Sequence, residues 1–166
     1  MAIETERKYL VRTCLLPPLG DGKQIVQAYL HVSKQVTIRA RIEGESAYIT
    51  VKGFQDKLSR PEFEYPVPID DAIFMINSMS PYPIIRKIRR EIFCHGKCWQ
   101  LDEFQEMNAG LWIAEIELTD PDEPVELPPW VSDEVTGDPR YLNSGLSINP
   151  YCNWNNGEKM DNLLNT

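Results

Sequence analysis

Charged side chains recur two residues apart along this chain, in segments where polar and apolar residues alternate. The first such segment, IETERKYLV, carries Glu4, Glu6 and Lys8. Because successive side chains of a β-strand point to opposite faces, charges at this spacing share one face. Ammonium and guanidinium groups bind phosphate oxygens, and carboxylates bind hard divalent cations such as Mg²⁺ or Mn²⁺. If such faces meet around one space, they predict a site for a polyanion and its metal ions.

The charges on these polar faces fall into two groups. The cations are Lys8, Arg39, Arg41, Lys52, Lys87 and Arg89. The carboxylates are Glu4, Glu6, Glu62, Glu64, Asp102, Glu115 and Glu117. An open sheet with one solvated face is one interpretation, and strand period alone favours it. The density of charge favours a sheet closed with these faces inward, whose interior must be wet, internally paired or occupied by charged ligands. Such an interior is not expected to be an apolar core.

The segments that must position these residues have mostly the period of strands. Eight strands are expected, over residues 3–11, 24–32, 36–44, 46–54, 60–68, 84–96, 97–105 and 111–119. Closure of so many sequential strands into a barrel would remove exposed edges. The predicted fold is therefore mainly β (α+β), an eight-stranded antiparallel closed β-barrel with a few short helices packed outside.

Helices are expected in three places, one between two strands and two after the last strand. Residues 69–80 predict a short helix capped by Asp70, with an apolar stripe of Ile73, Phe74, Ile76 and Met79. Two more short helices are expected over residues 128–138 and 138–146, each with a proline near its start. We expect one domain over residues 1–152, followed by a polar C-terminal tail over residues 153–166.

Composition excludes several classes of function. The net charge of −8 argues against a nucleic-acid partner, although a local basic site for a phosphorylated ligand is compatible with it. An apolar run of the length that crosses a membrane, about eighteen residues, is missing, so we expect no membrane partner and a cytoplasmic location. The four cysteines are expected to be free thiols. Cys94 and Cys98 flank His95 but lack a fourth ligand at zinc-site spacing.

The order of the charged blocks resembles that of the CYTH superfamily, the triphosphate tunnel metalloenzymes. ETERK is similar to the ExExK signature of this family, which alone is a weak motif. The blocks that follow in the order of its compact bacterial members are TIRAR, TVKG, EFEYP, RKIRRE, LDEF, NAGLWIAEIEL and VTGDPRYLNSGL. Together these blocks, from about residue 3 to about residue 146, are specific. The resemblance implies a tunnel that holds a triphosphate along its cations and one or two divalent ions, Mg²⁺ or Mn²⁺, along its carboxylates.

The resemblance also implies roles for individual residues. The cations named above would contact phosphate oxygens, and the carboxylates would hold metal ions directly, through water, or pair with the cations. Candidates for handling the attacking water are Glu62, Glu64, and Lys52 with Tyr29. A second interpretation makes Tyr29 a core aromatic.

Hydrolysis of inorganic triphosphate to pyrophosphate and phosphate is the expected reaction. Phosphoryl transfer depends on positioning and electrostatics, so it requires no Ser, Cys or His nucleophile. The alternatives are an adenylyl cyclase, a thiamine triphosphatase or a nucleoside triphosphatase of the same family, and a non-catalytic polyphosphate-binding module. An aromatic cradle for thiamine could come from Trp112, Trp130 or Tyr141. The pattern leaves open whether the chain forms a homodimer.

Overall fold

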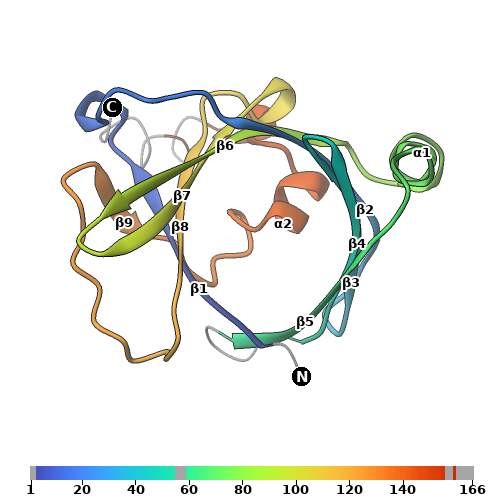
Figure 1. The fold of residues 1–166 in the computed structure, drawn as a ribbon. Coiled ribbons are helices and arrows are strands. Elements are labelled where there is room, and N and C mark those ends of the chain that lie inside the picture. Colours follow the sequence, from blue (N-terminus) through green and yellow to red (C-terminus); the bar gives the residue numbers. More distant parts are fainter. Residues whose placement is uncertain (1–2, 55–58, 156–158, 160–166) are drawn as a thin grey trace.

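Alternating polar and apolar residues form antiparallel strands that close into a barrel (Figure 1). The computed structural model describes residues 3–54, 59–155 and 159. Within these residues the strands are β1 (Ile3–Val11), β2 (Lys23–Val32), β3 (Thr37–Glu43), β4 (Ser46–Lys52), β5 (Ser59–Pro66), β6 (Ile85–Cys94), β7 (Lys97–Phe104), β8 (Trp112–Glu117) and β9 (Val131–Glu134). The predicted eight-stranded barrel is confirmed, and each predicted strand is found with ends that differ by at most two residues.

Strand β1 closes the barrel. The sheet order is β5-β4-β3-β2-β6-β7-β8-β1-β9, with an additional pairing between β5 and β1. That pairing is short, and the residue pairs are Ile3–Pro61, Glu4–Arg60 and Thr5–Ser59. A hydrogen bond of 2.8 Å between Thr5 Oγ1 and Ser59 Oγ accompanies it. Further along β1, strand β9 pairs with the edge that β5 no longer covers.

One of the predicted helices is instead a strand, β9. Residues 128–138 do not form the expected helix, because Val131–Glu134 pair with β1 as a ninth strand. The preceding Trp130 is buried against Trp99 on the outer wall, with ring centroids 5.6 Å apart. An unpaired edge on β1 and an apolar outer wall therefore outweigh the local helical signal of this segment.

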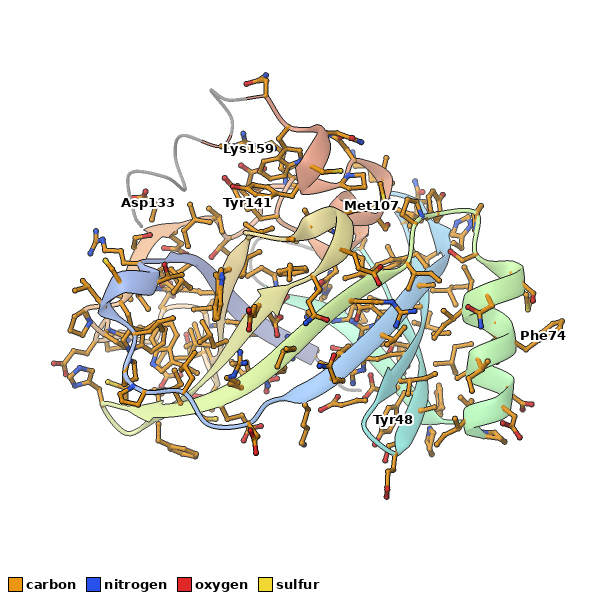
Figure 2. The ribbon with its side chains drawn as sticks, turned by 90° about the horizontal axis from the view of Figure 1, so that it is seen from above. Tyr48, Phe74, Met107, Asp133, Tyr141 and Lys159 are labelled. Atoms are coloured by element: carbon orange, nitrogen blue, oxygen red, sulfur yellow. The ribbon has the colours of Figure 1, made fainter. Side chains whose placement is uncertain are left out.

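Helix α1 (Ile69–Phe74) continues as a π-helical turn, η2 (Met75–Met79), and lies outside the barrel as predicted (Figure 1). Its N-cap is Pro68, so the prediction that Asp70 caps the helix is wrong. The predicted apolar stripe is also wrong, since Ile73, Phe74 and Met79 are exposed, and Figure 2 shows Phe74 pointing away from the barrel. Ile76 of that stripe is buried, in a cluster with two small residues of the outer wall, Ala28 and Ala40.

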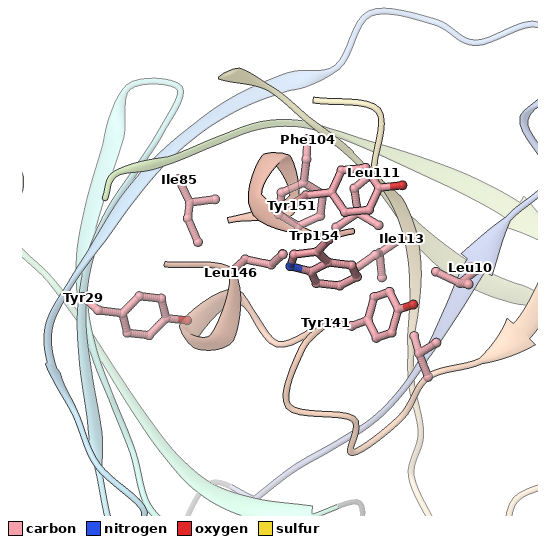
Figure 3. Packing of buried hydrophobic residues seen from close by; sticks show 11 residues of the cluster. Leu10, Tyr29, Ile85, Phe104, Leu111, Ile113, Tyr141, Leu146, Tyr151 and Trp154 are labelled. Carbon is pink, nitrogen blue, oxygen red and sulfur yellow. The ribbon is translucent and has the colours of Figure 1, made fainter. Parts of the chain in front are cut away.

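Helix α2 (Asn143–Ile148) begins later than the helix predicted over residues 138–146, and it lies inside the ring of strands (Figure 1). The expectation that all helices pack outside is therefore wrong. The inward residues at this end of the barrel are apolar and need cover, which Leu146 and Trp154 provide (Figure 3). The full cluster comprises Leu10, Tyr29, Ile85, Phe104, Leu111, Ile113, Val135, Tyr141, Leu146, Tyr151 and Trp154. The predicted tail thus starts with residues next to the core, and residues 156–158 and 160–166 lie outside the described residues.

Within the described ranges, short 3₁₀ turns complete the elements: η1 (Thr13–Leu15), η3 (Glu106–Asn108) and η4 (Tyr151–Asn153). A second apolar cluster lies on the outer wall, where Tyr9, Trp99 and Trp130 pack together. Cys14, Cys94, Cys98 and Cys152 are free thiols, as predicted. In the part of the chain that the structure describes, no helix has the length and apolar character needed to span a membrane.

Candidate active site

The inward faces of the strands enclose a charged cavity of about 550 Å³. The predicted site residues that line it are Glu4, Glu6, Lys8, Tyr29, Arg39, Arg41, Lys52, Glu62, Glu64, Lys87, Arg89, Glu115 and Glu117. Asp102 does not line the cavity, because it is fully buried behind Lys87 and Arg89. The strand period therefore predicted which side chains share one cavity, and the interpretation as an open, solvated sheet is wrong.

The interior of the barrel changes from ionic to apolar along its axis. On β1 the inward residue after Lys8 is Leu10, and on β8 the inward residue before Glu115 is Ile113. Register pairs Lys8 with Glu115 and Leu10 with Ile113, so the two strands change character at the same level. The expectation that the interior is not an apolar core therefore holds for one half of the barrel and is wrong for the other. The apolar half packs on α2, and residues 142–144 close the cavity at that end.

Lys8 stands between two carboxylates. Its Nζ donates to Glu115 Oε1 at 2.5 Å and lies 3.1 Å from Glu6 Oε1. Burial disfavours the charge, but the attraction of Glu115 and Glu6 outweighs it and raises the pKa of Lys8 above its ordinary value. In turn, Lys8 and Arg89 overcome the effect of burial on Glu115 and hold the pKa of that carboxyl well below its usual range. This pair stays ionised across the physiological range.

Lys87 shares its carboxylate with an arginine. Its Nζ donates to Asp102 Oδ2 at 2.5 Å, and Arg89 donates to both oxygens of Asp102 at 2.6 Å. The ammonium of Lys87 also lies 5.4 Å from the centroid of the Phe104 ring. Burial and the repulsion of Arg89 lower the pKa of Lys87 to about 8, despite the attraction of Asp102. Lys87 is therefore a cation that can lose its charge near physiological pH.

The guanidinium groups of Arg39 and Arg41 face the carboxylate of Glu64. Arg41 Nη2 donates to both oxygens of Glu64 at 3.0 Å, and Arg39 Nη2 donates to Thr50 Oγ1 at 3.2 Å. Thr50 in turn donates to Glu64 at 2.8 Å. The Nε atoms of both arginines are buried without a hydrogen-bond partner. Unsatisfied buried donors are rare in proteins, so these two atoms indicate capacity for an anionic ligand.

Glu4 of β1, Lys52 of β4 and Glu62 of β5 form a third group. Lys52 Nζ donates to the two oxygens of Glu4 at 2.9 and 2.7 Å and lies 3.2 Å from Glu62. Burial raises the pKa of Glu4, but the combined attraction of Lys52 and Arg60 outweighs burial and lowers this pKa to about 2. The pKa of Glu62 is raised by burial and by the charge of Glu4, against the attraction of Lys52. Of these two neighbouring carboxyls, Glu62 is thus the one that holds a proton more readily.

Arg60 is a cavity residue that the sequence interpretation missed. Its Nε donates to Glu4 at 2.9 Å and its Nη2 donates to Glu6 at 3.1 Å. The signal was present, because residue 60 has the same parity as Glu62 and Glu64 on β5. The strand expected over residues 60–68 includes this position, although only Glu62 and Glu64 were assigned to its polar face.

Tyr29 lies at the boundary between the two halves of the barrel. It is 6% exposed, belongs to the apolar cluster that includes Leu146, and also lines the cavity (Figure 3). Burial raises its pKa, so the phenol stays neutral and can donate a hydrogen bond. Trp112, Trp130 and Tyr141 are not among the residues that line the cavity, so they do not form the aromatic cradle that the thiamine triphosphatase alternative would need.

The carboxylates of the cavity fit a hard divalent cation. Oxygen donors select Mg²⁺ or Mn²⁺, and Glu4 lies within hydrogen-bonding reach of Glu62. Among the described residues, no three acidic, His or Cys side chains converge as a ready metal site, and most of the lining carboxylates face cations instead. The described lining carries seven cations and eight carboxylates and is close to neutral. A bound polyanion would leave excess negative charge, which a divalent ion offsets.

Comparisons with known proteins place this geometry in context. A model of the CYTH domain matches residues 2–142. The inorganic triphosphatase of Acetivibrio thermocellus is 40% identical over 154 residues, which cover 93% of this chain and 99% of that protein. The inorganic triphosphatase of Nitrosomonas europaea is 30% identical over 156 residues, 87% of this chain and 97% of that protein. A crystal structure of an inorganic triphosphatase superposes with a TM-score of 0.65 at 27% identity, covering 89% of this chain and 96% of the other.

Proposed function

The chain belongs to the CYTH domain family, and from this membership we propose that it hydrolyses inorganic triphosphate to pyrophosphate and phosphate with a divalent metal ion. Two relatives that it matches over most of their length are inorganic triphosphatases. The observation that carries the proposal is the closed barrel whose inward face is a charged cavity of about 550 Å³. We propose Mg²⁺ or Mn²⁺ as the ion. A cytoplasmic location, the lack of nucleic-acid and membrane partners and a possible homodimer stay predictions.

The cations of two walls would hold the triphosphate. Arg39 and Arg41 have buried Nε donors to spare on one wall, and Lys87 and Arg89 lie on β6. Lys8 adds a permanent charge between them, since its two carboxylate partners keep it protonated. A guanidinium group can donate two parallel hydrogen bonds to one phosphoryl group, which fixes the orientation of the chain of phosphates.

The carboxylates would hold the metal and accept the proton of water. Glu4, Glu6, Glu64, Glu115 and Glu117 are oxygen donors that could hold the ion, directly or through water, together with Glu62, and the buried Asp102 orients Lys87 and Arg89. When bound, a divalent ion neutralises charge on the phosphoryl oxygens and activates water. Glu62 is the best candidate to accept the proton of the attacking water, because its pKa is raised. Lys52, 3.2 Å away, and Tyr29 would orient that water.

The shape of the cavity favours inorganic triphosphate over larger triphosphates. One end is closed by α2 and its apolar cluster, so a nucleoside or thiamine could extend only through the other end. Among the described lining residues Tyr29 is the one aromatic side chain, and it lies at the closed end. Binding energy for a base or a thiazole ring is therefore small compared with that for phosphates.

Phosphate release tests this proposal, measured in parallel on inorganic triphosphate, ATP and thiamine triphosphate, with Mg²⁺, with Mn²⁺ and with EDTA. We expect the highest rate on inorganic triphosphate and no release with EDTA. Glu4→Gln and Lys8→Ala should each lower kcat/KM by roughly a hundredfold or more, the cost of losing one electrostatic contact in such a site.

Arg90→Gln is the control, since Arg90 pairs with Glu103 at 2.8 Å on the outer face. Equal or faster release from ATP would contradict the assigned substrate. Tight binding of triphosphate without any release would instead favour a polyphosphate-binding module.

A further inference from the structure

Arg60 lies where the barrel closes, and it holds the two carboxylates of the ExExK stretch. Its backbone pairs with Glu4 across the short β1–β5 seam. Its guanidinium spans Glu4 Oε2 at 2.9 Å and Glu6 Oε1 at 3.1 Å, and its side chain is 15% exposed. The planar guanidinium holds the two carboxylates through two different nitrogen atoms in a fixed geometry. The oxygens that would bind a metal ion at these two residues are thus already occupied by a cation.

The three cations around Glu4 and Glu6 would respond differently to a metal ion. If the ion took both carboxylates, Lys8 would keep Glu115 at 2.5 Å and Lys52 would keep Glu62 at 3.2 Å. The ion pairs described for Arg60 are with Glu4 and Glu6, so this residue would lose both. A largely buried guanidinium without an anion is strongly unfavourable. Arg60 would therefore need a new anion inside the same cavity.

A phosphoryl group is the anion that the reaction supplies. Arg60 lines the cavity together with Arg39 and Arg41, whose buried Nε atoms have no hydrogen-bond partner. We propose, building on the proposed function, that Arg60 is an exchanging cation: it occupies Glu4 and Glu6 in the empty site, is displaced by the metal ion, and then donates to the triphosphate. Metal and triphosphate then favour each other's binding, and this coupling is equal in both directions. In the absence of triphosphate, Arg60 thus keeps the affinity of the site for a metal ion low.

Direct binding of Mn²⁺, followed by electron paramagnetic resonance, tests this exchange without turnover. Mn²⁺ is titrated alone and with a methylene-bridged triphosphate analogue that cannot be hydrolysed. In the wild type we expect the analogue to tighten Mn²⁺ binding by roughly tenfold or more. In Arg60→Gln we expect Mn²⁺ alone to bind several-fold more tightly than in the wild type, and the analogue to add less. Arg60→Lys should fall between the two, because it keeps the charge but lacks the two-nitrogen fork of the guanidinium.

Arg90→Gln is the matched control, because Arg90 is a half-buried arginine paired with a carboxylate outside the cavity, and its Mn²⁺ affinities should equal those of the wild type. Circular dichroism establishes whether each variant is folded. If Arg60→Gln is not folded, the Mn²⁺ affinities of Arg60→Lys are compared with those of the wild type instead. Weaker Mn²⁺ binding in Arg60→Gln would overturn the proposal, since Arg60 would then orient the carboxylates. Unchanged binding would overturn it as well. If the wild type releases no phosphate while these affinity differences hold, the proposed function fails and the exchange stands.

Discussion

Lys8 and Lys87 are two buried lysines of one cavity whose pKa values move in opposite directions. Burial lowers both, so the difference lies in their neighbours. Lys8 has two carboxylate partners, Glu115 and Glu6. Lys87 has Asp102, which also binds the guanidinium of Arg89, and the repulsion of Arg89 brings the pKa of Lys87 to about 8. Two lysines on strands that are separated by β7 and β8 therefore have different charge states in weakly alkaline solution.

The charge of Lys87 should set the alkaline limit of triphosphate binding. Its lowered pKa means that it is charged below about pH 8 and loses its proton above, so kcat/KM should fall as the pH rises through this value. Lys87→Arg keeps the charge and should move the fall to higher pH. The measurement is the pH profile of kcat/KM for inorganic triphosphate at constant free metal concentration. Identical alkaline limbs in the two proteins would show that another group controls the decline.

Helix α2 is the element that the sequence described least well, and the reason is physical. Apolar residues such as Leu146 and Trp154 indicate a buried face, but their partners Leu10 and Ile113 lie far away along the chain. Strand period predicts which side chains share a face and says nothing of where along the barrel axis a face turns apolar. Conversely, the strands themselves were predictable, because local alternation and turn signals coincide with their ends. The ninth strand was not, since only an open edge on β1 makes it one.

Gly145 allows α2 to pack against the chain that leads into it. A Cβ atom built at this position would lie 1.8 Å from the carbonyl oxygen of Pro139, a backbone atom that cannot simply turn away. Alanine would otherwise favour a helix by about 1 kcal/mol, but the clash should outweigh this preference and lower the free energy of unfolding by about 1–3 kcal/mol. Urea denaturation of Gly145→Ala measures the change. The triphosphatase rate should fall too, because residues 142–144 line the cavity.

Gly20→Ala is the matched control for this prediction. A Cβ at Gly20 would have no heavy atom within 4 Å, so its unfolding free energy should stay close to that of the wild type. If Gly145→Ala proved as stable as Gly20→Ala, the close approach of Pro139 would not constrain α2.

At the scale of the whole molecule, closure turns a dense charged face into a neutralised interior. The parity of each strand predicted which charges meet, and the cavity contains nearly all of them. Their partners could not be predicted, because pairs such as Lys8 with Glu115 and Lys52 with Glu4 depend on strand register across the closed ring. Parity places Arg60 on the inward face as well, but its pairing with Glu4 could not be predicted, because it depends on the seam between β1 and β5. The interior charges are thus a property of the barrel and not of any one strand.

The stability of the whole barrel should therefore fall in acid. The pKa of Glu4 is lowered from 4.5 to about 2 by Lys52 and Arg60 against the effect of burial, and the pKa of Glu115 is lowered as well. A carboxyl group whose pKa is lower in the folded than in the unfolded state stabilises the fold at pH values above its unfolded-state pKa. This stabilisation is lost as the pH falls through the pKa of the folded state. For Glu4 the loss between about pH 4.5 and pH 2 amounts to about 3 kcal/mol.

Urea denaturation at pH 7 and at pH 3 compares the wild type with Glu4→Gln and Glu103→Gln. Glu4→Gln should be less stable at pH 7 and should lose less stability on acidification, because the titrating group is gone. Glu103→Gln should behave like the wild type, since the side chain of Glu103 is 32% exposed and its pair with Arg90 lies outside the barrel. An equal acid loss in all three proteins would mean that Glu4 does not hold its ionised state through the interior network. The neutralisation of the empty cavity would then come from other pairs, and the exchange proposed for Arg60 would lose its electrostatic basis.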